Sequence, residues 1–110
     1  MMNKFKNAWS GILCAMKHKS VLLQMILGCF AVIAGAFMQL SIVEWCLVVI
    51  CIGSVIAAEM INTCIEKICD MYSLDTRMDI KMIKDIAAGA VLIVSMMALT
   101  VAIALLIKHI

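Results

Sequence analysis

Charged side chains are scarce in this sequence, and proline is absent. Only 15% of the 110 residues are charged and 66% are hydrophobic, whereas a soluble domain has about 25% charged and 45–50% apolar residues. The composition therefore argues against a water-soluble globule. The chain has only five glycines, and together with the sparse charge this argues against collagen-like and intrinsically disordered chains.

The six cysteines all lie inside apolar stretches. None belongs to a C-x-x-C pair or stands beside a run of histidines, the pattern that a zinc site needs. We therefore interpret them as small hydrophobic residues of buried helices rather than as a disulfide or metal framework.

Three long apolar runs dominate the chain. Residues 21–40 contain no charge, and twenty helical residues span about 30 Å, the thickness of the hydrocarbon core of a bilayer. A second run starts at Ile42 and carries one early charge, Glu44, while a third, from Ile86 to Ile107, carries none. We predict an all-α integral membrane protein with a single domain, residues 1–110, and membrane helices at 21–40, 43–70 and 84–107.

Basic residues are concentrated on one side of these predicted helices. The connection near Ser41 has none, whereas eight lie before the first helix or around the loop predicted at 71–83: Lys4, Lys6, Lys17, Lys19, Lys67, Arg77, Lys81 and Lys84. The positive-inside rule then places the N-terminus and the 71–83 loop in the cytoplasm. Within residues 3–19, apolar side chains recur at helical spacing among the lysines, which predicts an amphipathic helix on the cytoplasmic membrane surface.

Polar residues gather on one face of the second helix, at its cytoplasmic end. At 100° per residue, five of them fall within about 100° of one another: Glu59, Asn62, Thr63, Glu66 and Asp70. Glu59 lies about 24 Å along the helix from Val43, near the inner edge of the hydrocarbon. Charged groups are costly in that environment, so three carboxylates on one face indicate a cation, a conduction pathway or another subunit as their partner.

This face is suited to phosphoryl transfer. An acceptor hydroxyl needs a carboxylate to take its proton, and a nucleotide-bound Mg²⁺ takes carboxylate ligands. Lys84 opens the third helix at the same depth, where a cation can neutralise phosphate charge. The spacing alone leaves two other interpretations open, helix packing and ion or proton transport. Neither a glycine-rich phosphate loop nor a nucleic-acid-binding element occurs.

Two motifs resemble a known family. The run Glu59-x-x-Asn62-Thr63-x-x-Glu66-x-x-x-Asp70 is similar to the signature of the small prokaryotic diacylglycerol kinase and undecaprenol kinase family. The stretch KDIAAGAVL, residues 84–92, resembles that family's entry into its third membrane span and favours the undecaprenol kinase branch. The length, the order of the two motifs and the three-span plan agree with the same family.

The resemblance implies a homotrimeric kinase of the bacterial inner membrane with active sites at subunit interfaces. Its substrates would be ATP, with Mg²⁺, and a membrane lipid alcohol, undecaprenol or diacylglycerol. By position, Glu59 would be the catalytic base, Asn62 would orient groups of the site and Glu66 would ligate the metal. The remaining motif residues would bind and position the nucleotide: Asp70, Lys84 and Asp85.

One position departs from the family pattern. The family usually has a metal-binding glutamate in the segment before the first span, and this chain has Lys19 there. A lysine cannot bind Mg²⁺, so either one metal position is lost, or water or Asp79 replaces it, or the chain is a weakened or inactive relative. A small multi-span transporter is the alternative from another functional class.

Overall fold

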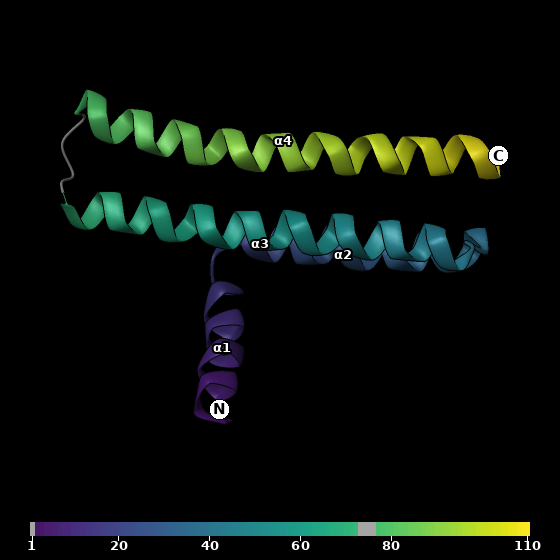
Figure 1. Ribbon diagram of the computed structural model, residues 1–110, viewed down its shortest axis with the longest axis horizontal. Helices are drawn as coiled ribbons and strands as arrows, with labels where there is room; N and C mark the ends of the chain where they lie inside the picture. The colour runs from purple at the N-terminus through teal and green to yellow at the C-terminus, as the bar shows by residue number, and fades with distance from the viewer. Residues whose placement is uncertain (1, 73–76) are drawn as a thin grey trace.

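Four helices follow one another along the chain in the computed structural model (Figure 1), which describes residues 2–72 and 77–110. They are α1 (Met2–Ala15), α2 (Lys19–Met38), α3 (Ile42–Tyr72) and α4 (Met78–His109). α2, α3 and α4 are each long and apolar enough to cross a membrane. The predicted all-helical fold with three long apolar helices is thereby confirmed.

The helix ends differ from the predicted boundaries in two places. α1 ends at Ala15 and α2 already begins at Lys19, inside the surface helix predicted at 3–19. α4 begins at Met78 rather than at Lys84, within the loop predicted at 71–83, of which residues 73–76 lie outside the described ranges. The apolar run that starts at Ile86 marks only the membrane part of α4. The helix begins before this run, in a segment of mixed charged and apolar residues that includes the buried Ile80.

α3 is the central helix of the fold, because it packs against both α2 and α4 and runs antiparallel to each (Figure 1). The close approach of α2 to α3 depends on two buried glycines of α2, Gly28 and Gly35. A Cβ atom at Gly28 would lie 2.8 Å from Ile52 Cγ2, and one at Gly35 would lie 3.0 Å from Trp45 Cη2. Small residues let membrane helices pack closely in this way.

The connection between α2 and α3 is tight. Gln39 follows α2 in the left-handed conformation, with φ 55° and ψ 57°, which ends the helix and reverses the chain. Ser41 then caps α3: its Oγ accepts a hydrogen bond from the Glu44 backbone N–H at 3.2 Å, and its own N–H donates to Glu44 Oε1 at 2.9 Å. This reciprocal pair is a capping box, and it fixes the start of α3.

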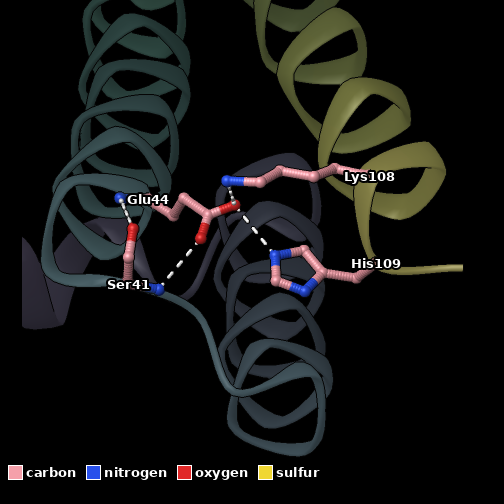
Figure 2. Close-up of polar contacts among 4 residues, drawn as sticks. All are labelled: Ser41, Glu44, Lys108 and His109. Atoms are coloured by element: carbon pink, nitrogen blue, oxygen red, sulfur yellow. Dashed lines mark hydrogen bonds and ion pairs between the residues drawn. The ribbon is translucent and has the colours of Figure 1, made fainter.

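The Glu44 carboxylate also joins α3 to the last turn of α4 (Figure 2). Its Oε2 atom lies 2.9 Å from His109 Nε2 and 3.4 Å from Lys108 Nζ, and its side chain is only 8% exposed. We call Glu44, Lys108 and His109 the Glu44 clasp. Each charge is also well placed along its helix, since an anion is favoured at a helix start and cations at a helix end.

α2 covers only part of α3. It has 20 residues against 31 in α3, and both start from the same tight connection. Because Gly28 faces Ile52 and Gly35 faces Trp45, the same antiparallel spacing brings the start of α2 close to Glu59. From that level α1 leaves the bundle almost at right angles, while α3 and α4 continue side by side beyond it (Figure 1).

Candidate active site

The acidic face of α3 changes from buried to exposed along the helix. Glu59 and Asn62 are 7% and 6% exposed, whereas Glu66 and Asp70 are exposed. The change occurs where α3 passes the start of α2, so that only α4 accompanies its last turns. One end of the face is therefore enclosed by protein, and the other is open to a polar ligand.

Two hydrogen bonds organise the middle of this face. Asn62 Nδ2 donates to Glu66 Oε1 at 2.9 Å, which orients both side chains one turn apart. Thr63 Oγ1 donates to the backbone carbonyl of Glu59 at 2.9 Å. The remaining polar atom of the Asn62 amide, Oδ1, is buried without a hydrogen-bond partner among the described residues.

No described side chain hydrogen-bonds to the Glu59 carboxylate. A carboxylate in this setting is available to accept a proton from a group that docks beside it. Its position on α3 is one turn before Asn62, so the buried amide oxygen and this carboxylate face the same space. The two predicted catalytic residues are thus neighbours in the structure.

The polar start of α4 is joined to this face by one ion pair. Lys84 Nζ lies 2.6 Å from Asp70 Oδ1, with side-chain exposures of 37% and 51%. This contact brings together two of the three residues predicted to bind nucleotide. The third, Asp85, instead pairs with Lys81 at 2.6 Å along α4 itself. Neighbouring residues of a helix point about 100° apart, which is why Asp85 and Lys84 make different contacts.

Two other predicted positions make no contact with the face. Lys19 is the first residue of α2 and is exposed. Asp79 pairs with Arg77 at 3.0 Å, and its other oxygen accepts a hydrogen bond from the Ile80 N–H. Asp79 is therefore engaged within the first turn of α4 in this structure.

The oxygen atoms of the face fit a hydrated divalent cation carried by a nucleotide. Mg²⁺ usually takes one or two carboxylates and completes its shell with water and phosphate oxygens. Glu66 supplies an exposed carboxylate, and the unpartnered Asn62 Oδ1 supplies a second oxygen nearby. No group of three or more acidic, histidine or cysteine side chains with metal-binding geometry occurs within residues 2–72 and 77–110. The donor set therefore suits a metal that arrives with phosphate ligands.

An apolar groove of about 520 Å³ leads toward this face between α2, α3 and α4. Val55, one turn before Glu59, and Gln24 of α2 line it near the site. Val48 and Leu105 line it at the far end, one turn from Glu44 and His109 respectively. The groove thus extends along α3 from Val55 to Val48, about one turn short of Glu59 at one end and of Glu44 at the other, with an almost wholly apolar wall.

Comparison with known proteins fits this arrangement. The model of the prokaryotic diacylglycerol kinase family matches residues 6–106, nearly the whole chain. The chain belongs to the prokaryotic diacylglycerol kinase family. The family match includes both motifs, so it also covers the acidic face of α3 and the Lys84 turn of α4.

A curated relative lies within the undecaprenol kinases. Undecaprenol kinase of Bacillus subtilis (strain 168) is 38% identical over 63 residues, which make up 57% of this chain. The chain spans about half the length of that relative, 51%. No solved structure shows a significant match. The comparisons therefore support the family assignment from sequence, and the geometry of the site comes from the present structure.

The Glu44 clasp of this diacylglycerol kinase family member was not predicted from the sequence. Glu44 was expected only as a charge near the start of the second membrane helix, yet it is buried and bound by α4. Two signals in the sequence point to it. Ser41 and Glu44 have the S-x-x-E spacing of a capping box, and two basic residues, Lys108 and His109, end the antiparallel neighbour of α3.

Proposed function

We propose that this protein is a membrane lipid kinase that transfers the γ-phosphoryl group of ATP to a lipid alcohol. The observation that carries the proposal is the Lys84–Asp70 contact, because it joins a phosphate-binding cation to a face with a buried carboxylate. Membership of the diacylglycerol kinase family and the undecaprenol kinase relative support the same activity. We favour undecaprenol as the substrate and keep diacylglycerol as the alternative.

The protein is placed in the bacterial inner membrane with its N-terminus in the cytoplasm. α2 is about 30 Å long and matches the hydrocarbon core, whereas α3 is about 46 Å long and extends past it. α1 leaves the bundle at the level of Glu59, with Phe5 and Trp9 exposed. An amphipathic α1 on the membrane surface puts Glu59 at the interface and Glu66, one to two turns further, in the cytoplasm.

Glu59 is proposed as the catalytic base. The lipid hydroxyl oxygen bonds to the γ-phosphorus, the bond from that phosphorus to the bridging oxygen of ADP breaks, and the hydroxyl proton passes to the Glu59 carboxylate. ADP and a lipid phosphate are the products. Asn62 holds Glu66 by its amide nitrogen and directs its amide oxygen toward the reacting groups. The buried end of the face excludes bulk water from this transfer.

The exposed end of the face is proposed to bind the nucleotide. Glu66 would hold Mg²⁺, which when bound neutralises part of the phosphate charge. Lys84 contacts a phosphate after leaving Asp70, and Asp70 positions the nucleotide. Asp85 helps to position the nucleotide only if it leaves Lys81, because the two are paired in the structure.

The apolar groove supports a lipid rather than a soluble alcohol as the acceptor. A hydrocarbon chain bound between the three helices would end near Val55, one turn from Glu59, and so could present its hydroxyl to that carboxylate. The membrane supplies the chain laterally, so the site needs no opening toward the cytoplasm for this substrate.

We also propose that three copies assemble and share sites between subunits. Large apolar side chains are exposed along α4, among them Leu92, Met96 and Ile103. Such a surface is covered either by lipid or by neighbouring helices, and the family plan favours a homotrimer. A neighbouring subunit also offers polar groups to the open side of the α3 face.

The test is phosphate transfer from labelled ATP to a panel of lipid alcohols, with the full chain in liposomes. We expect labelled undecaprenyl phosphate, or phosphatidic acid from diacylglycerol, in the lipid extract. Glu59→Gln keeps the shape of the side chain and removes the base, so it should lower kcat roughly 10²–10⁴-fold. Lys67→Gln is the matched control, because it neutralises an exposed charge on the same helix outside the acidic face.

Three outcomes would contradict the proposal. If the wild type labels none of the lipids, the chain is not an active kinase on these substrates. If Glu59→Gln retains wild-type turnover, Glu59 is not the base. A proton-coupled cation flux that requires Glu59 but not Lys84 would indicate a transporter instead.

A further inference from the structure

Side chains of α3 and α4 make polar contacts with each other at two places in residues 2–72 and 77–110. One is the Asp70–Lys84 pair at the active-site end, and the other is the Glu44 clasp at the opposite end. The two places are about 39 Å apart along α3. Between them no polar side-chain contact joins the described parts of the two helices.

The two contacts differ in burial. The Asp70 and Lys84 side chains are 51% and 37% exposed, so water and ions compete for their charges. The Glu44 side chain is 8% exposed and that of His109 is 21% exposed. The Glu44 carboxylate accepts hydrogen bonds through both of its oxygens, one from the Ser41 N–H and one from His109 (Figure 2). The clasp is therefore the more persistent of the two contacts.

The proposed reaction requires the exposed contact to open. Lys84 can neutralise a phosphate only when its ammonium group turns away from Asp70. At that moment the Glu44 clasp is the remaining polar contact between the described parts of α3 and α4. Residues on both helices must still face the same nucleotide, with Glu66 on α3 and Lys84 on α4.

We infer that Glu44 is a positioning residue: through His109 and Lys108 it fixes the axial register of α4 against α3 while Lys84 binds phosphate. This inference rests on the proposed function for the role of Lys84. It assigns a catalytic purpose to a buried carboxylate that takes no part in the chemistry. The charged or titratable groups at this end are Glu44 on α3 and Lys108 and His109 on α4, and α2 has no charged residue near its end.

Thiol labelling of the native cysteines measures the register without requiring activity. Cys69 is buried near the active-site end of α3, whereas Cys64 is exposed and serves as an internal reference. The full chain in lipid nanodiscs is treated with N-ethylmaleimide, and labelling at each cysteine is followed by peptide mass spectrometry. His109→Ala removes the shorter of the two α4 contacts to Glu44, leaves the Lys108 contact at 3.4 Å, and leaves the capping box of α3 intact.

We expect His109→Ala and Glu44→Ala to raise the labelling rate of Cys69 relative to Cys64 by at least about fivefold, because loss of a charged hydrogen bond favours local opening. Ser41→Ala is the matched control. It removes the hydroxyl that caps α3 but none of the contacts between α3 and α4, so the ratio should stay unchanged. Glu44→Gln keeps the shape and the accepting oxygen and should give an intermediate ratio.

Kinetics separates positioning from general stability. The axial register of α4 against α3 affects the nucleotide site strongly, because that site uses residues of both helices. It affects the Glu59–Asn62 pair less, because both of these residues lie on α3. His109→Ala should therefore raise KM for ATP roughly fivefold, while Ser41→Ala should leave it unchanged.

Cys69 labelling that stays at the wild-type ratio in both His109→Ala and Glu44→Ala would overturn the inference. So would an equal rise in Ser41→Ala, because it would show simple fraying of α3. If the wild type transfers no phosphate at all, the proposed function fails, and the labelling ratios still decide whether the clasp sets the register.

Discussion

Replacement of Gly28 by alanine tests the packing that brings α2 to the active-site helix. A Cβ atom at this position would lie 2.8 Å from Ile52 Cγ2, whereas carbon atoms in favourable contact are about 3.5–4.0 Å apart. Ile52 is β-branched, and such side chains have essentially one χ1 rotamer in a helix. The clash therefore requires a shift of a helix backbone rather than of a side-chain end.

The expected cost is the usual penalty for overpacking, about 1–3 kcal/mol. A glycine-to-alanine change in a helix also brings a favourable propensity contribution of up to about 1 kcal/mol. Gly53→Ala isolates that contribution, because a Cβ atom at Gly53 would meet nothing within 4 Å. The difference in unfolding free energy between the two variants should thus equal the strain alone, about 1–3 kcal/mol.

Unfolding in mixed micelles of dodecylmaltoside and SDS gives the measurement. Trp45 packs on Gly35, so its fluorescence reports the separation of α2 and α3, and Trp9→Phe removes the other tryptophan signal. Ile52→Ala deletes the clashing Cγ2 and should restore part of the stability of Gly28→Ala. Equal stability of Gly28→Ala and Gly53→Ala, with no rescue by Ile52→Ala, would refute this packing of α2 on α3.

Two further changes test the nucleotide end of the site. Lys84→Met should raise KM for ATP roughly 10- to 100-fold, because a charge-assisted contact to phosphate is lost. Lys81→Met is the control: it removes a cation that is paired with Asp85, and it should change KM for ATP less than about threefold. Lys19→Glu restores the family's usual acidic residue at the start of α2 and should raise kcat/KM at low Mg²⁺ concentration. If the dependence of kcat/KM on Mg²⁺ concentration is unchanged, this position binds no metal here.

The fold could be predicted because each long apolar run avoids water and forms a helix within the membrane. The uncharged stretch 21–40 and the run ending at Ile107 leave no other arrangement with satisfied backbone hydrogen bonds in a membrane. The start of α4 could not be placed in the same way. Met78 to Asp85 is a polar helical segment, and its helicity depends on the burial of Ile80, which the sequence alone does not reveal.

The acidic face was predictable because helical periodicity depends on one element only. Spacing along α3 places Glu59, Asn62 and Glu66 together, and the Asn62–Glu66 hydrogen bond agrees with it. Contacts between helices were not predictable, since they depend on the rotation of α4 about its axis. That rotation brings Lys84 to Asp70 and leaves Asp85 with Lys81. Glu44 was missed for the same reason: its partners lie 64 and 65 positions away.

The unequal lengths of α2 and α3 make the site sensitive to bilayer thickness. α2 begins where α1 turns aside, so the surrounding lipid sets how deep that junction lies, and Glu59 moves with it. Hydrophobic mismatch is relieved by tilting or by local deformation of the lipid, at a fraction of a kcal/mol per Å. We expect turnover to peak in acyl chains of one length and to decline in both shorter and longer ones.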